Sequence, residues 1–223
     1  GYVHLGGGAT INRFSFPDEV RTTLAAGTTN ANNQAAGFND SGVAGYIGTG
    51  WGPTTVVNKW AFTDDTRTTL GTGTSAARYN ACGFSNNGVA GYVLGGQNPS
   101  YSSEDTVWQF TFPSDTQSTL GTGLASTTTE SAGMSNSGVA GYNCGGQTSS
   151  GMTSNVEKFT FPGNSTSILS TGLSSNRRSR PAGMANKGVA GYVCGGSTSS
   201  AHDAGTDVVD KFAFPGESRS TLG

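Results

Sequence analysis

A short glycine-rich string returns along the chain about every 50 residues. It reads SGVAGYIG at 41–48, NGVAGYVL at 87–94, SGVAGYNC at 137–144 and KGVAGYVC at 187–194. A fixed period of this length indicates one supersecondary unit that cannot bury its apolar face alone and stacks against copies of itself. The glycines therefore belong to a structural repeat, and they do not predict a phosphate-binding loop.

Three further segments recur with the same period. The first carries aromatic residues at alternate positions, as in Phe110 and Phe112, which places both rings on one face of a strand. A Thr-rich segment ending in Leu follows, and then a Gly-Phe or Gly-Met segment leads through Asn/Asp-x-Gly turns into the next glycine-rich string. The copies stand at 11–17, 57–63, 107–113, 156–162 and 209–215, at 21–24, 67–70, 117–120, 166–169 and 219–222, and at 34–38, 80–84, 131–134 and 181–184.

Each repeat is predicted as four short antiparallel strands with no helix between them. Four-stranded units repeated about every 40 to 50 residues are typical of a β-propeller, in which each blade buries its faces against its neighbours. We therefore predict an all-β, single-domain propeller over 1–223, with repeats at about 1–38, 39–84, 85–134, 135–184 and 185–223. The glycines let strands pack closely near a crowded central channel.

The repeat resembles the kelch family of propeller repeats. The likeness rests on GYVLGG at 91–96, GYNCGG at 141–146 and GYVCGG at 191–196, on VEKFTFPGNSTSIL at 156–169, and on the position of Arg78 and Arg178. The tryptophan of the last kelch strand is replaced by leucine, for example Leu120, so the chain is similar to a divergent branch of the family. Repeats of this kind also resemble those of bacteriophage and bacterial surface proteins.

We letter the strands of a blade from the channel outward: A is the Gly-Phe/Met segment, B the glycine-rich string, C the aromatic segment and D the Thr-rich segment. The sequence holds five B, five C and five D segments but four A segments. Five blades is the leading count, and six or seven remain open if further repeats flank the chain. The missing A strand is expected just before Gly1 or just after Gly223, and an unpaired edge would invite pairing with another chain.

The loops after strands B and D differ in every copy and are expected on one face of the propeller. Variable loops on a repetitive scaffold suit a recognition surface, because the frame holds them while they carry specificity. Aromatic rings together with Asn, Asp and Arg suit a sugar, whose apolar face stacks and whose hydroxyls pair with planar polar groups. The candidate ligand-binding residues are Trp51, Arg78, Tyr79, Tyr101, Glu130, Arg178, Arg180, His202 and Asp203.

Composition argues against several functional classes. Charged residues are 12% and the formal net charge is −2, so no basic footprint for nucleic acid or anionic membrane exists, and no apolar run is long enough to insert into a membrane. Only two histidines are present, His4 and His202, without metal-binding spacing, so we expect no metal, no cofactor and no catalytic residues. The three cysteines, Cys82, Cys144 and Cys194, are expected to be small buried residues with free thiols.

The sequence therefore favours a non-enzymatic recognition or display module on an extracellular surface or virion. Its expected partner is a glycan or a protein receptor, bound by the variable loop face. An alternative is a structural subunit of a phage tail, fibre or extracellular filament, in which other copies or subunits are the partners. A propeller enzyme is the third interpretation and the least favoured, because histidines are few.

Overall fold

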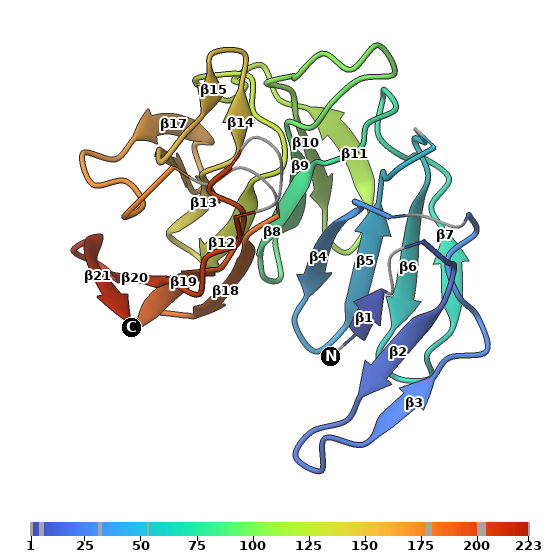
Figure 1. Ribbon diagram of the computed structural model, residues 1–223. Coiled ribbons are helices and arrows are strands. Elements are labelled where there is room, and N and C mark those ends of the chain that lie inside the picture. Colours follow the sequence, from blue (N-terminus) through green and yellow to red (C-terminus); the bar gives the residue numbers. More distant parts are fainter. Residues whose placement is uncertain are drawn as a thin grey trace.

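The computed structural model describes residues 2–4, 7–30, 33–52, 54–176, 180–199 and 204–222, and every regular element in these ranges is a β-strand. Five antiparallel sheets stand around a central channel as the blades of a propeller (Figure 1). The predicted all-β propeller with five blades is confirmed. Within the described ranges, no helix has the length and apolar character to cross a membrane.

The strands follow the chain blade by blade. The first blade holds β1 (Tyr2–His4), β2 (Ile11–Phe14) and β3 (Arg21–Thr23), and the second β4 (Ala36–Asp40), β5 (Ala44–Gly48), β6 (Val57–Ala61) and β7 (Arg67–Thr69). The third holds β8 (Cys82–Asn86), β9 (Ala90–Leu94), β10 (Val107–Thr111) and β11 (Thr116–Thr119). The fourth holds β12 (Ala132–Asn136), β13 (Ala140–Cys144), β16 (Val156–Thr160) and β17 (Ser165–Ile168), and the fifth β18 (Ala182–Asn186), β19 (Ala190–Cys194), β20 (Val209–Ala213) and β21 (Ser218–Leu222).

Two details differ from the sequence prediction. A small hairpin of β14 (Gln147–Thr148) and β15 (Gly151–Met152) forms inside the B–C loop of the fourth blade, where only a loop was expected. Each A strand also includes the Asn or Asp that was predicted to begin the A–B turn. The A–B turn is therefore shorter than predicted. Gly88 sits in that turn with a φ of 75°, which is the positive backbone angle predicted for it.

Glycines let the A strands approach one another around the channel. A Cβ placed on Gly83 would lie 2.3 Å from the carbonyl oxygen of Gly37, and one on Gly133 would lie 2.1 Å from that of Gly83. Only a residue without a side chain fits at this distance, because real Cβ atoms do not approach backbone oxygens so closely. The glycine of the A strand is therefore required by the packing of neighbouring blades.

Neighbouring blades are joined by a tyrosine of strand B. The ring of Tyr46 stacks on Phe112 of the next blade with centroids 5.4 Å apart, and its hydroxyl donates to Asp115 at 2.7 Å. Lys59 pairs with the same carboxylate at 2.7 Å. Burial and the bond to Asp115 raise the pKa of Tyr46. The same arrangement joins Tyr2 to Phe62 and Asp65, Tyr92 to Phe161 and Asn164, and Tyr142 to Phe214 and Glu217.

The cysteines are part of the core. Cys82 and Cys144 are buried free thiols, as predicted, and Cys194 is half-buried and also free. Burial raises the pKa of Cys82 to about 12. A thiol that stays protonated at neutral pH is a poor nucleophile, so Cys82 contributes packing volume.

One buried carboxyl makes stability depend on pH. Glu157 on β16 is buried and accepts a hydrogen bond from the backbone N–H of Ala125 in the preceding D–A loop. Burial raises its pKa to about 7, the bond from Ala125 opposes the rise, and Asp105 adds to it. The folded chain thus keeps this proton up to about pH 7, whereas the unfolded chain releases it near 4.5. Between these values the folded state binds more protons, so the free energy of unfolding falls as pH rises.

We expect Gly91→Ala to destabilise the propeller, because the new Cβ would lie 2.0 Å from the ring of Phe38. Overpacking of this kind costs about 1–3 kcal/mol of the free energy of unfolding, measured by chemical denaturation. Gly71→Ala is the matched control, since a Cβ at Gly71 meets nothing within 4 Å. Equal stabilities for the two variants would show that the A strand does not pack tightly on strand B of the next blade.

We expect Glu157→Gln to flatten the pH dependence. The amide can still accept the bond from Ala125 but has no proton to lose, so the variant should gain stability relative to the unmodified chain between pH 5 and pH 8. Urea denaturation of both proteins at the two pH values measures this. Parallel pH profiles would contradict the raised pKa of Glu157.

Candidate functional site

Three aromatic residues from three different loops meet on the face that carries the B–C and D–A loops. Trp51 comes from the B–C loop of the second blade, Tyr79 from the D–A loop that follows it, and Tyr101 from the B–C loop of the third blade. Ring centroids are 5.1 Å apart for Trp51 and Tyr79, 5.7 Å for Tyr79 and Tyr101, and 6.4 Å for Trp51 and Tyr101. We call these three residues the aromatic cluster.

Backbone hydrogen bonds fix the loop of Trp51. Its own N–H donates to the carbonyl of Asn33 at 2.7 Å, and the N–H of Gly50 donates to that of Arg78 at 2.9 Å. The turn continues through Gly52, whose φ is 80°. Trp51 is 48% exposed, so its indole can stack against a ligand.

A single asparagine organises the loop of Tyr101. The side-chain oxygen of Asn98 accepts from the N–H groups of Ser100 and Ser102 at 2.9 and 3.1 Å, and its amide donates to Glu104 at 2.7 Å. The N–H of Tyr101 donates to the carbonyl of Asn98 at 2.9 Å. These bonds fix the backbone of the loop, in which Tyr101 has a φ of 65°. The side chain of Tyr101 is exposed.

Tyr79 lies between the two exposed rings and is only 2% exposed. Its backbone pairs with Gln97, with N–H···O distances of 3.1 and 2.8 Å. Its hydroxyl is buried and has no hydrogen-bond partner among the described residues. Burial, and to a smaller extent the neighbouring Tyr101, raises its pKa. Buried hydroxyls are nearly always paired, so this one is a feature that a ligand could satisfy.

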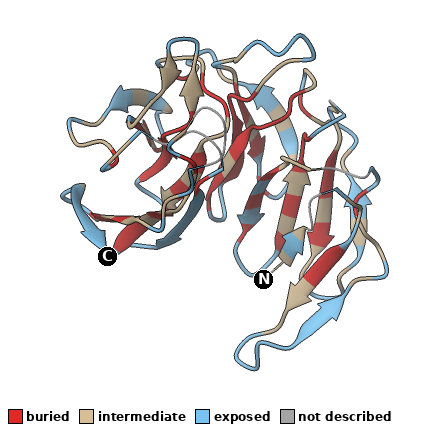
Figure 2. Ribbon diagram, in the orientation of Figure 1, coloured by how far each residue is buried: buried red, intermediate tan, exposed pale blue. Residues whose placement is uncertain are grey.

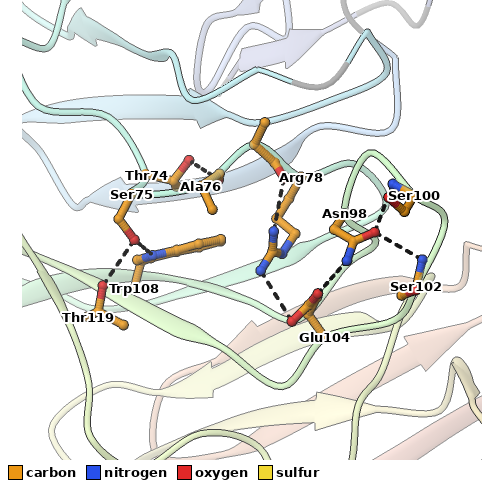
Figure 3. Close-up of polar contacts among 11 residues, drawn as sticks. Thr74, Ser75, Ala76, Arg78, Asn98, Ser100, Ser102, Glu104, Trp108 and Thr119 are labelled. Atoms are coloured by element: carbon orange, nitrogen blue, oxygen red, sulfur yellow. Dashed lines mark hydrogen bonds and ion pairs between the residues drawn. The ribbon is translucent and has the colours of Figure 1, made fainter.

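The sequence predicts that Arg78 is an exposed, ligand-binding residue. This prediction is wrong on exposure, because the structure buries Arg78 beneath the loops. Its guanidinium lies over Trp108, 5.2 Å from the ring centroid, and pairs with Glu104 at 3.4 Å (Figure 3). Burial lowers its pKa, while Glu104 and Asp105 oppose that change. Glu104 also accepts from Asn98, so Arg78 supports the loop of Tyr101 from below.

Polar residues ring the mouth of the channel next to the aromatic cluster. The residue two positions before each A strand has a positive φ: 58° at Gln34, 55° at Asn80, 58° at Glu130 and 57° at Arg180. The last three donate their N–H to the carbonyl of the equivalent residue in the preceding blade, at 3.1 Å from Asn80 to Gln34, 3.0 Å from Glu130 to Asn80 and 3.3 Å from Arg180 to Glu130. The four residues line a cavity of about 680 Å³.

The channel mouth also holds polar atoms that the chain does not fully satisfy. Asn80 donates to Glu130 at 3.3 Å and to Gln97 at 3.2 Å. Among the described residues, the buried side-chain oxygens of Asn33 and Gln34 have no partner. Tyr79 and Asn80 are consecutive, as are Asn33 and Gln34, so the aromatic cluster and the channel mouth are parts of one surface.

The structure thus brings together five predicted residues in two groups, with Trp51, Tyr79 and Tyr101 in one and Glu130 and Arg180 in the other. Arg178, His202 and Asp203 lie outside the described residues. Sequence reasoning missed Gln34 and Asn80, although both occupy the same repeat position as Glu130 and Arg180. A comparison of polar residues down that repeat position would have found them.

The described residues contain no group of three or more His, Cys, Asp or Glu side chains that could hold a metal ion. The aromatic cluster offers stacking, and the channel mouth offers hydrogen bonds from polar and charged side chains.

We expect Arg78→Ala to lower the free energy of unfolding by about 2–3 kcal/mol, because it removes a buried cation from Trp108 and leaves Glu104 without its ion pair. Amide hydrogen exchange should also become faster over 97–104. Arg180→Ala, at an exposed arginine, is the control. An Arg78→Ala protein as stable as that control would contradict the supporting role.

Neither a protein-family model nor a curated protein matches this sequence. The chain is similar to the solved structure of YjhT, with a TM-score of 0.69 and 14% sequence identity, over 100% of this chain and 94% of that one. At this identity the likeness shows the fold alone. The comparison therefore supports the propeller, and the kelch assignment of the repeat stays a prediction.

Proposed function

We propose that this propeller is a non-enzymatic recognition module that binds a glycan on its B–C and D–A loop face. The observation that carries the proposal is the aromatic cluster, in which two exposed rings flank a buried tyrosine with an unpartnered hydroxyl. Three separate loops contribute one residue each, and each loop is held by hydrogen bonds to its neighbours. A rigid aromatic platform of this kind loses little entropy when a ligand binds.

A sugar fits this platform better than a charged or wholly apolar ligand. The apolar face of a pyranose ring can stack on Trp51 or Tyr101, while its hydroxyls can reach Tyr79 and the polar groups of the channel mouth. The side-chain oxygens of Asn33 and Gln34 can accept hydrogen bonds, and the hydroxyl of Tyr79 can donate one. These groups match the mixed donor and acceptor character of sugar hydroxyls.

The proposal places the protein on an extracellular surface or virion, as the resemblance of its repeats to kelch-type and phage surface repeats implies. A protein receptor that presents a glycan or a polar loop would use the same surface. No catalytic step is part of this function.

The second candidate function is a structural subunit of a phage tail, fibre or extracellular filament. What favours it is the resemblance of the repeats to those of bacteriophage and bacterial surface proteins. Contacts would then form at blade edges, and the aromatic cluster would have no ligand.

We expect the purified propeller to bind selectively on a glycan array and Trp51→Ala or Tyr101→Ala to weaken that binding at least about tenfold. The physical reason is the loss of a stacking ring, since about 1.4 kcal/mol corresponds to a factor of ten in Kd. Tyr79→Phe should weaken binding while leaving the ring in place, because it removes only the buried hydroxyl. Titration of the best glycan into each variant gives the Kd values.

Val89→Ala is the control, because Val89 is as exposed as Trp51, at 48%, and lies in an A–B turn on the opposite face. Its Kd should match that of the unmodified protein. A folded propeller that binds no glycan, or whose binding survives all three cluster variants, would contradict the proposal and favour the structural subunit.

A further inference from the structure

Trp51 stands at a repeat position that other blades fill with a polar side chain. Its backbone N–H donates to the D–A loop before its own blade at 2.7 Å, and the N–H groups of Gln97 and Gln147 make the equivalent bond at 2.8 Å each. Ser197 follows the double glycine at the same position in the fifth blade. Glutamine or serine is therefore enough for the frame, and the fold does not require the indole of Trp51.

Tyr79 departs from the repeat in a similar way. The equivalent residue of the next D–A loop is Thr129, whose hydroxyl donates to the carbonyl of Asn80 at 3.4 Å. The hydroxyl of Tyr79 is also buried, yet it has no partner among the described residues. Burial raises the pKa of Tyr79, so its hydroxyl keeps its proton and can donate it. The unsatisfied donor thus occurs at the junction that also carries Trp51.

The two exposed rings of the aromatic cluster make edge-to-face contacts with Tyr79. The ring planes of Trp51 and Tyr101 meet that of Tyr79 at 72° and 73°. Trp51 is 48% exposed and Tyr101 is 65% exposed, and the tip of the Tyr101 loop at 99–102 is exposed as a whole (Figure 2). Tyr79 is therefore the floor of the cluster, and a ligand group that packs against the exposed rings comes next to it.

A group that pairs with Tyr79 must be an acceptor that tolerates apolar neighbours. A sugar hydroxyl can accept from Tyr79, but its own proton then needs a second partner, which the rings of Trp51 and Tyr101 do not offer. A carbonyl oxygen only accepts, so it leaves no proton unpaired. The planar amide around such a carbonyl can also pack against aromatic rings. An amide carbonyl therefore fits this floor better than a hydroxyl.

The charges beneath the cluster favour an uncharged group. Arg78 pairs with Glu104 at 3.4 Å, and the carboxylate of Asp105 also acts on it (Figure 3). These two carboxylates exceed the charge of the one guanidinium. A carboxylate of a ligand brought to Tyr79 would lose its hydration and would be repelled by both, so an acidic sugar is disfavoured there.

The other side of the cluster needs donors from a ligand. The backbone at 50–51 is bonded to two D–A loops, to Arg78 next to Tyr79 in one and to Asn33 in the other. The side-chain oxygens of Asn33 and Gln34 are buried and have no partner among the described residues. A ligand that suits this surface therefore brings an acceptor to Tyr79 and N–H or O–H donors to the Asn33 loop.

We infer that the aromatic cluster selects glycans that carry an acetamido group, that is, N-acetylhexosamines in preference to plain hexoses and acidic sugars. This inference rests on the proposed glycan binding. The amide carbonyl accepts from the hydroxyl of Tyr79, and the amide plane and methyl group pack against Trp51 and Tyr101. The amide N–H and the neighbouring hydroxyls donate to the side-chain oxygens of Asn33 and Gln34.

Selectivity follows from the donor that is left unpaired when the acetamido group is absent. A hexose with a hydroxyl in its place leaves either Tyr79 or its own proton without a partner in apolar surroundings. An amino sugar brings an ammonium group, which has no acceptor atom for Tyr79. A binding site built around a polar partner discriminates strongly against analogues that lack it.

The test compares glycans that differ at a single substituent. The tightest binder on the glycan array is titrated into the purified protein beside its two analogues, in which a hydroxyl or an amine replaces the acetamido group. We expect the acetamido glycan to bind at least about tenfold more tightly than either analogue. Tyr79→Phe should remove most of that preference, because only the acetamido carbonyl pairs with the hydroxyl, and Val89→Ala should leave the preference unchanged.

A second measurement needs no ligand. Tyr79→Phe removes a hydroxyl that has no partner, so the Tm should not fall. Thr129→Val is the matched variant, because it removes the bonded hydroxyl of the equivalent residue, and its Tm should fall. An equal loss of Tm in both variants would show that the chain already satisfies the hydroxyl of Tyr79, and it would overturn the inference.

The outcomes separate this inference from the proposed function. A tightest binder without an acetamido group, equal Kd values for the three analogues, or a Tyr79→Phe protein that keeps the preference would overturn the inference and leave glycan binding in place. A folded protein that binds no glycan would overturn both proposals.

Discussion

The propeller depends on the contact that a strand-B tyrosine makes with the next blade. At Tyr46 this contact combines stacking on Phe112, a hydrogen bond to Asp115 and an ion pair between that carboxylate and Lys59. A single blade cannot bury its aromatic face, so each blade is stable only with its neighbour in place. Stability of this kind is distributed along the ring of blades.

The position of the aromatic cluster follows from this frame. Because successive blades are held in a fixed relation, loops that are about 50 residues apart in sequence, such as those of Trp51 and Tyr101, meet at 6.4 Å. The buried Arg78 and the half-buried Glu104 then fix the conformations of these loops from beneath. Residues such as Trp51 and Tyr101 can be substituted without changing the strands of the blades. This property suits the proposed binding of a ligand through the loops.

The junction of the fifth and first blades differs from the other four junctions. The tyrosine contact joins four pairs of blades, and at the junction of the fifth and first blades Phe16 is exposed where its counterpart Phe112 is buried. The A strands of the other blades pack backbone against backbone through glycine, as Gly133 does on Gly83.

The period of the repeat, the alternation of Phe110 and Phe112 and the Asn-x-Gly turns determined the strand order and the propeller, because these signals are local and recur in every copy. The sequence alone also indicated the missing A strand and the face on which the variable loops lie. It placed Trp51, Tyr79 and Tyr101 among the candidates but could not bring them together, and it expected Arg78 at the surface. Distances between loops of different blades, and the burial of Arg78 over Trp108, depend on how blades pack around the channel, and only the tertiary structure decided them.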